Sequence, residues 1–327
     1  MNHRSVHRPA LWLAIWAGAG ALAVALGLML GATGWEPWWQ SPAAPLLWDL
    51  RWPRSLGAWL AGAALGVSGC VAQTLFRNPL ADPYLLGSAT GAGLGVGVMW
   101  WLSLWWSSTL VWSPALGGFV GAWLALALVI TLARGQVHGT PLILAGLIVS
   151  VLLGATLSLL LRTHPQLMPA LQGFLLGQTV YLDHQACLQM ALVLAVGVTW
   201  AWWWGPQLDA LSLGDDLAHS LGVNVPRVRR DQVLLMSALT AIAVAHVGLV
   251  AFVGWVAPHL VRPVLPQASR WRLLGAGLAG GAVLAVADLV ARVVVAPQEW
   301  PVGIITAWVG GSWMLALMRR GQRQGQA

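Results

Sequence analysis

The sequence predicts an all-α integral membrane protein, and three observations support this fold class. Of the 327 residues, 58% are hydrophobic and only 8% are charged, whereas soluble domains carry about 25% charged residues. The mean hydropathy is +0.73, and long apolar runs recur along the whole chain. The chain contains no lysine, so its net charge of +7 is due to arginine. No cluster of basic and aromatic residues of the kind that binds nucleic acid is present in the sequence.

The first apolar run, residues 11–33, follows Arg4 and Arg8. Basic residues followed by an apolar stretch are also found in secretory signal peptides. The apolar core of a signal peptide has about 7–15 residues. This run is longer and reaches the roughly 20 residues that cross the hydrocarbon layer of a bilayer. We therefore predict a retained first span.

Nine more apolar runs are candidates for membrane crossings. They cover residues 56–76, 85–106, 110–133, 142–161, 186–204, 233–252, 255–265, 273–295 and 302–318. The run at 255–265 is shorter than a full span and contains Pro258, which interrupts a helix. Broken helices of this kind line cavities in transporters. The sequence thus predicts ten crossings, one of them short or broken.

The arginines predict the orientation of the chain. If the N-terminus lies in the cytoplasm, thirteen of the 17 arginines lie on the cytoplasmic side. The four on the outer side are Arg51, Arg54, Arg162 and Arg292. An excess of positive charge is typical of loops that stay in the cytoplasm. We therefore predict a cytoplasmic N-terminus, which requires an even number of crossings between Arg230 and Arg262.

Charged groups are almost absent from the predicted spans. Asp288 is the one acidic residue well within a run, and Arg292 follows one helical turn later, which predicts a local ion pair near the outer end. A charge inside the membrane is otherwise a functional candidate. Because ion-coupled transporters need acidic or histidine relays in mid-membrane, this scarcity disfavours a proton-coupled secondary transporter.

Local signatures of catalysis are missing from the sequence. The chain has no HExxH motif, Walker phosphate loop, GxSxG elbow or spaced Cys/His cluster. We therefore expect no catalytic residue, no metal and no cofactor bound by this chain, and an ATP-driven system would need a separate ATPase subunit. Cys70 and Cys187 lie in or beside apolar runs, which favours packing over a disulfide.

Residues 206–231 form the longest polar stretch and lie on the cytoplasmic side of the predicted topology. Asp215 and Asp216 suit the N-terminus of a short helix, and Gly222 suits its end. The apolar flank of this helix would consist of Leu217, Ala218 and Leu221. Such a flank can seat in a groove of a partner protein, and a solvated loop helix is the alternative.

Two further patterns concern the backbone. The run at 56–76 carries closely spaced small residues, which let membrane helices approach one another, with a pore lining as the alternative. Its glycines include Gly62, Gly66 and Gly69. Directly after this run, Pro79 and Pro83 forbid a continuous helix and predict a stiff turn on the cytoplasmic side.

Together these patterns resemble the membrane subunits of ABC importers for iron–siderophores, haem and cobalamin, the FecCD family. The similar blocks are RWPR at 51–54, GAALGVSG at 62–69, RNPLADPYLLG at 77–87, GDDLAHSLG at 214–222, FVGWVAPHLVR at 252–262, ADLVAR at 287–292 and EWPVGIITA at 299–307. They follow the order of the family's blocks and extend over nearly the whole chain.

The resemblance implies one transmembrane permease domain over residues 1–327, a ten-helix bundle with a cytoplasmic coupling segment at 206–231. It implies a homodimer in the cytoplasmic (inner) membrane of a bacterium. Its partners would be two cytoplasmic ABC ATPase subunits, which use the ATP, and a periplasmic or lipid-anchored substrate-binding protein. An iron–siderophore is the leading cargo on the breadth of the family, and haem and cobalamin stay open.

The resemblance also implies roles for particular residues. The ATPase-coupling residues would be Asp209, Leu213, Gly214, Asp215, Asp216, Leu217, Ala218, Leu221 and Gly222. The arginines that dock acidic groups of the binding protein would be Arg51, Arg54 and Arg292. Candidates for the translocation path are Gly62, Gly66, Gly69 and Gln73. The turn at the inner mouth would comprise Arg77, Asn78, Pro79 and Pro83.

Two rival functions stay open, a proton-coupled secondary transporter and a non-transporting membrane scaffold or enzyme subunit. ATP-driven uptake together with an ATPase and a binding protein would support the importer. Uptake by this chain alone on a proton gradient would support the first rival, and catalysis without transport would support the second.

Overall fold

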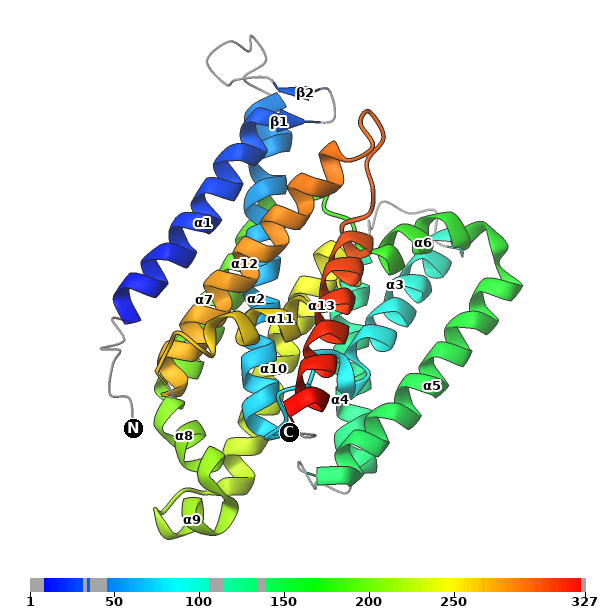
Figure 1. Ribbon diagram of the computed structural model, residues 1–327. Coiled ribbons are helices and arrows are strands. Elements are labelled where there is room, and N and C mark those ends of the chain that lie inside the picture. Colours follow the sequence, from blue (N-terminus) through cyan, green and yellow to red (C-terminus); the bar gives the residue numbers. More distant parts are fainter. Residues whose placement is uncertain are drawn as a thin grey trace.

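The computed structural model describes residues 9–31, 34–35, 46–105, 114–133, 139–266 and 268–324, almost all of them helical (Figure 1). The α-helices are α1 (Pro9–Met29), α2 (Trp52–Leu75), α3 (Ser88–Trp105), α4 (Pro114–Leu132), α5 (Gly139–Thr163), α6 (Met168–Leu176), α7 (His184–Trp203), α8 (Gly205–Leu213), α9 (Asp215–Ser220), α10 (Val225–Val247), α11 (Val253–Val261), α12 (Ser269–Val293) and α13 (Val302–Gln324). The shorter elements are the π-helix η1 (Leu46–Arg51), the 3-10 helices η2 (Pro83–Leu86) and η3 (Pro165–Leu167), and the antiparallel strands β1 (Leu30–Gly31) and β2 (Gly34–Trp35).

Helix α2 forms the centre of the bundle. It packs against α1, α7, α10, α11 and α12, and 89% of its most apolar stretch is buried. A second group, α3 with α4 and α5, packs beside it through α10. Figure 1 shows α1 and α12 alongside α2 on one flank of the bundle and α5 on the opposite flank. A helix that is apolar all round is buried in this way.

The three glycines of α2 lie where neighbouring helices touch its backbone. A Cβ atom on Gly66 would collide with the carbonyl oxygen of Ala276 in α12, and one on Gly69 with the carbonyl oxygen of Gly254 in α11. Gly62 meets the backbone of α12 in the same way. Small residues permit such close approach between membrane helices. Close packing therefore accounts for all three glycines, and a role for them in a translocation path stays a prediction.

Each of the ten predicted apolar runs overlaps one helix, namely α1, α2, α3, α4, α5, α7, α10, α11, α12 and α13. Counting the described residues alone, six of these helices, α1, α2, α4, α5, α7 and α12, are long and apolar enough to cross a membrane on length and composition alone. The all-helical class with several apolar helices is therefore confirmed. Arg4, Arg8, residues 32–33 and the start of the run at 110–133 lie outside the described residues.

The predicted runs at 233–252 and 255–265 have different bounds in the structure. Helix α10 ends at Val247, because Gly248 takes a positive φ (+70°) with extended ψ, a conformation that glycine adopts easily and that stops the helix. Two backbone hydrogen bonds join this break to the region around the end of α6: Gln178 N donates to Val247 O at 2.8 Å, and Leu249 N donates to Phe174 O at 3.0 Å. Helix α11 has nine residues and continues through Pro258 to Val261. The prediction of a short helix is confirmed, whereas the interruption expected at Pro258 and the predicted end of the preceding run are wrong.

The two ends of the bundle carry different features. At one end, which we call the cluster end, the first turn of α2 meets the last turns of α12. At the other end, which we call the elbow end, α8 and α9 project beyond the rest of the bundle (Figure 1). The start of α1 and the end of α13 lie toward the elbow end (Figure 1).

Candidate functional site

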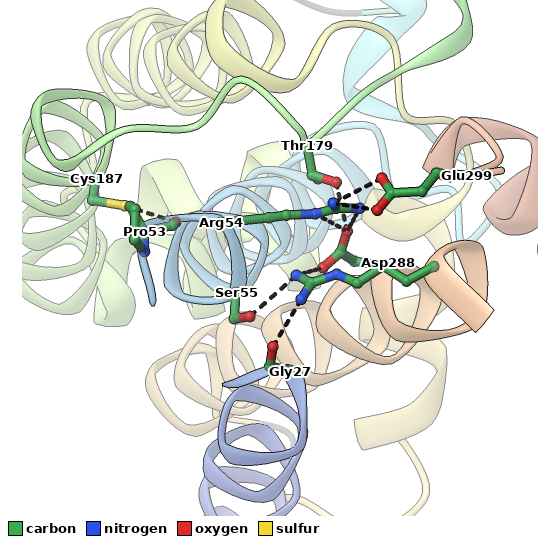
Figure 2. A network of polar contacts seen from close by, with 9 residues as sticks. Gly27, Pro53, Arg54, Ser55, Thr179, Cys187, Asp288 and Glu299 are labelled. Carbon is green, nitrogen blue, oxygen red and sulfur yellow. Dashed lines mark hydrogen bonds and ion pairs between the residues drawn. The ribbon is translucent and has the colours of Figure 1, made fainter. Parts of the chain in front are cut away.

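Five polar side chains gather at the cluster end and form what we call the arginine cluster (Figure 2). Its members are Arg54, Thr179, Asp288, Arg292 and Glu299. Arg54 comes from the first turn of α2, and Asp288 and Arg292 come from the last turns of α12. The other two come from the loops before α7 and α13. The cluster thus joins segments that are far apart in the sequence.

Arg54 holds two carboxylates at once. Its Nη1 donates to both oxygens of Glu299, at 3.0 and 2.8 Å. Its Nε and Nη2 both donate to Oδ1 of Asp288, each at 3.2 Å. Thr179 Oγ1 donates to the same Asp288 oxygen at 2.5 Å. Because a guanidinium is a planar fork, such paired contacts fix geometry as well as charge.

Arg292 occupies the other side of Asp288. It forms an ion pair with Oδ2 of Asp288, which confirms the pair predicted from helical spacing. Its Nη1 donates to Gly27 O of α1 at 2.9 Å, and its Nη2 donates to Ser55 Oγ at 3.1 Å. Asp288 and Arg292 are 1% and 2% exposed. Buried charges are tolerated when they are paired, so the cluster fastens α1 and α2 to α12.

The three arginines predicted to dock the binding protein differ in exposure. Arg292 is 2% exposed and is held within the cluster. Arg54 is 12% exposed and is committed to Glu299 as well as to the cluster's aspartate. Arg51 is half-buried and donates from Nη1 to Leu28 O at 3.2 Å. Docking stays a prediction for all three arginines.

The elbow, defined as α8 with α9, packs on the start of α10 through a small core. This core consists of Ala210 and Leu211 of α8, Ala218 of α9, and Val225 and Val228 of α10. Helix α9 begins at Asp215, and Gly222 lies just beyond its end, as predicted. The large apolar side chains that the elbow exposes are Leu213, Leu217 and Leu221. Ala218 is 0% exposed, so its predicted place on the outer flank is wrong, because it faces this core.

Two aspartates fasten the elbow to the bundle. Asp215 accepts hydrogen bonds from Arg77, just after α2, and from Nη2 of Arg229 in α10, the latter at 2.7 Å. Asp209 Oδ1 accepts the N–H of Ser269 at the start of α12 at 2.7 Å. Partial burial alone would raise the pKa of Asp215, but the guanidinium groups of Arg229 and Arg77 outweigh it and hold that pKa below its usual value.

The turn after α2 connects this helix to the elbow. Arg77 takes a left-handed conformation (φ +48°), and its Nε donates to Leu211 O at 3.0 Å. Asn78 Oδ1 accepts the N–H of Leu80 at 2.9 Å, and Pro83 begins η2. The predicted stiff turn is confirmed, and its place at an inner mouth stays a prediction.

The remaining predicted site residues also lie at the elbow end. Gln73 and Pro79 line a cavity between α2, α8, α11 and α12, and Gln73 Nε2 donates to Trp255 O at 3.3 Å. Asp216 is exposed in the first turn of α9, and Gly214 joins α8 to α9. Among the residues that the structure describes, no three His, Cys, Asp or Glu side chains come together as metal ligands.

Sequence reasoning missed Glu299, Thr179 and Arg229 as site residues. Glu299 lies 245 positions from Arg54, and Thr179 lies 109 positions from Asp288. Helical periodicity carries no information about such distant pairs. The signal that was available is the family-like block that begins at Glu299, which places an acidic group on the same predicted side as the outer arginines.

Comparison with known proteins extends the resemblance over nearly the whole chain. The sequence pattern of the FecCD transport family matches residues 10–320. The hemin transport system permease protein HmuU of Yersinia pestis is 36% identical over 293 residues, which cover 88% of each chain. The vitamin B12 import system permease protein BtuC of Pectobacterium atrosepticum is 35% identical over 288 residues, covering 88% of this chain and 86% of that one.

Solved structures agree with these relatives. A metal-chelate type ABC transporter in an inward-facing conformation has a TM-score of 0.85 at 26% identity, covering 94% of this chain and 98% of that one. PsaBC from Streptococcus pneumoniae, in complex with Fab, has a TM-score of 0.58 at 17% identity over 81% of this chain and 90% of that one, a likeness of fold alone. Bacterial members of the family are inner-membrane transport permeases, and the ATPase activity lies in separate subunits. The chain therefore belongs to the FecCD transport family and is the membrane-spanning permease of an ABC importer.

Proposed function

We propose that this chain is one half of a homodimeric permease that imports a metal chelate, with ten crossings per chain and the elbow end in the cytoplasm. The observation that carries the proposal is the elbow, which exposes three leucines while two aspartates fasten it to the bundle. A projection of this kind can seat in a groove of a partner protein. We assign two ABC ATPase subunits to it, and these use the ATP, while this chain binds no cofactor.

The fastenings of the elbow support the transmission of force. Asp209 links α8 to the start of α12, and Asp215 links α9 to the region just after α2 and to α10. Because α2 and α12 touch backbone to backbone, a push on the elbow moves both helices together. In the proposed cycle, two such chains rock about a central path that opens to each side in turn.

The arginines support the proposed orientation. Those on elements of the elbow end are Arg77, Arg227, Arg229, Arg230, Arg262, Arg270 and Arg272. Those of the cluster end are Arg51, Arg54, Arg162 and Arg292. Positively charged loops stay in the cytoplasm, which assigns the elbow end to that side. The cluster end then faces the binding protein, and the half-buried Arg51 is our candidate for docking its acidic groups.

The cargo that we propose is a metal tetrapyrrole, haem or cobalamin. The support is that relatives at 36% and 35% identity are permeases named for hemin and vitamin B12. The sequence by itself favoured an iron–siderophore on the breadth of the family, and a direct test must separate the three chelates.

Reconstitution in vesicles tests this proposal. The purified chain is combined with its ATPase and its binding protein, and uptake of haem, cobalamin and a ferric siderophore is measured with and without ATP. Uptake that requires ATP on the elbow side supports the importer, and the preferred chelate identifies the cargo. Uptake by the chain alone on a proton gradient contradicts the proposal. Light scattering of the solubilised permease reports whether two chains associate.

The exposed leucines supply matched variants for the elbow. Leu217→Asp places a charge on the face that we assign to the ATPase, so we expect ATP-driven uptake to fall by about tenfold or more. The melting temperature Tm stays unchanged because Leu217 is exposed. Leu217→Met keeps the face apolar and is the control. Equal uptake by the two variants contradicts the assignment of the elbow.

A further inference from the structure

A cavity of about 480 Å³ lies at the elbow end, between the last turns of α2 and the helices α8, α11 and α12. Arginines and hydroxyl groups line much of it, namely Arg77, Arg262, Arg272, Thr74, Ser212 and Ser269. Among the described residues of its wall, the one carboxylate is Asp209. Neither the coupling role of the elbow nor the arginine cluster accounts for Arg262 and Arg272.

The positive charge of this cavity exceeds the negative charge that the described residues supply. Arg77 is already paired with Asp215, which leaves Arg262 and Arg272 against Asp209. One oxygen of Asp209 is taken up by the backbone at the start of α12. Within the described part of the chain, the guanidinium groups of Arg262 and Arg272 form no hydrogen bond or ion pair, and their like charges repel one another.

Arg272 carries the clearest sign of a missing partner. Its Nε is buried and has no hydrogen-bond acceptor within the described chain. A buried, charged donor without an acceptor is costly, and an acceptor that enters the cavity would satisfy it. Guanidinium forks match the oxygens of phosphate and carboxylate groups. The cavity is many times larger than the roughly 30 Å³ of one water, which leaves room for a phosphate group and its substituent.

We propose that this cavity binds a phosphate-bearing anion, with Arg262 and Arg272 as its charged ligands and the Ser269 hydroxyl as a further donor. The same chemistry comes from two sources, the headgroup of an anionic phospholipid or a free phosphate in the cytoplasm. Basic pockets between helices at the cytoplasmic surface suit lipid headgroups. Because Ser212 of α8 lies in the same wall, the bound anion bridges the elbow to α11 and α12.

The wild-type chain tests the site first. The full chain is purified in phosphate-free maltoside micelles, and Tm is followed as inorganic phosphate or phosphatidylglycerol is added. Sodium chloride at equal ionic strength and phosphatidylcholine are the controls. We expect a ligand-dependent rise in Tm of about 2–4 °C. A rise with phosphatidylglycerol alone assigns a lipid site, and a rise with phosphate alone assigns a soluble anion. No rise above the controls with either ligand overturns the proposal.

Variants then locate the site. Arg262→Gln and Arg272→Gln remove a charge and keep a polar side chain, and we expect the ligand-dependent rise in Tm to disappear in both. Arg227→Gln is the matched control, because Arg227 is an exposed arginine of the same end that does not line the cavity. A rise that persists in both cavity variants, or an equal loss in the control, overturns the proposal. If one cavity variant cannot be purified as a monodisperse protein, the test is made with the other variant and with the wild-type titrations.

Discussion

The arginine cluster and the elbow use the same chemistry, an aspartate held by two arginines, in opposite surroundings. In the cluster, Asp288 is 1% exposed and its partner Arg292 is 2% exposed. At the elbow, Asp215 is 37% exposed, and its partners Arg77 and Arg229 are 40% and 8% exposed. Loss of one partner from a buried pair leaves an uncompensated charge, whereas an exposed pair contributes little to stability. The ion pairs of the cluster are therefore expected to be essential for the stability of the fold, whereas those of the elbow are expected to contribute less to stability.

Helix α2 connects these two regions. Arg54 lies in its first turn, and Arg77 lies just after its end. Between them, the glycines of α2 touch the backbones of α11 and α12. We therefore expect the effect of substitutions on stability to decrease along α2. Changes in the cluster should unfold the protein, and changes in the middle of α2 should disturb helix packing. Changes at the elbow should mainly alter transport.

The largest effect is expected at the centre of the cluster. Asp288→Asn removes the charge that Arg54 and Arg292 share, and breaking a buried pair costs about 3–5 kcal/mol. We expect a large fall in the Tm of the purified chain or a failure to recover monodisperse protein. Asp216→Asn, which removes an exposed carboxylate from the elbow, is the control and should leave Tm unchanged. Similar Tm values for the two variants would show that the cluster does not stabilise the fold.

An intermediate effect is expected in the middle of α2. Gly66→Ala adds a methyl group that collides with the carbonyl oxygen of Ala276, and overpacking of this kind costs about 1–3 kcal/mol. Gly18→Ala is the matched control, because no atom lies within 4 Å of a Cβ at that position. Thermal unfolding of the two variants in detergent makes the measurement. If both keep the wild-type Tm, the backbone contact does not hold α2 to α12.

A smaller effect on stability is expected from the elbow fastening. Asp215→Asn should lower the free energy of unfolding by about 1–2 kcal/mol, because the pair with Arg77 is exposed but Arg229, which is 8% exposed, also loses its partner. It should also loosen α9 and lower ATP-driven uptake. Partial burial of the Asp215 carboxylate tends to raise its pKa, but Arg229 and Arg77 outweigh this effect and lower the pKa. Its stabilisation is therefore complete above the ordinary carboxyl pKa and is lost as the pH falls through the lowered value.

Hydrogen exchange of the α9 amides measures this pH dependence. In the wild type, we expect protection of α9 to fall as the solution becomes acidic. In Asp215→Asn, protection should be low throughout and nearly independent of pH over the same range. The same acid-dependent loss in both proteins would show that another group fastens the elbow.

The smallest effect is expected at Arg51. Because a charge at the rim of an interface acts mainly on the association rate, Arg51→Gln should slow association with the binding protein by up to about tenfold at low salt. The difference between variant and wild type should shrink as salt is added. Surface-immobilised binding protein and solubilised permease give the rates. A change confined to dissociation would place Arg51 outside the encounter surface.

Local patterns predicted much of this structure. The apolar runs coincide with helices because a segment that crosses lipid must be long and must satisfy its own backbone hydrogen bonds. The Asp288–Arg292 pair follows from helical spacing, and the ends of α9 follow from Asp215 and Gly222. All of these features depend on residues that are close together in the chain.

The sequence by itself determined the membrane class, the apolar runs and the place of the elbow in the chain. Only the tertiary structure decided that Glu299 reaches Arg54, that Arg292 is buried beneath α1, and that Ala218 turns into the core between the elbow and α10. The physical reason is that periodicity reports which face of one helix is apolar. Ion-pair partners and burial depend instead on how separate helices pack against one another.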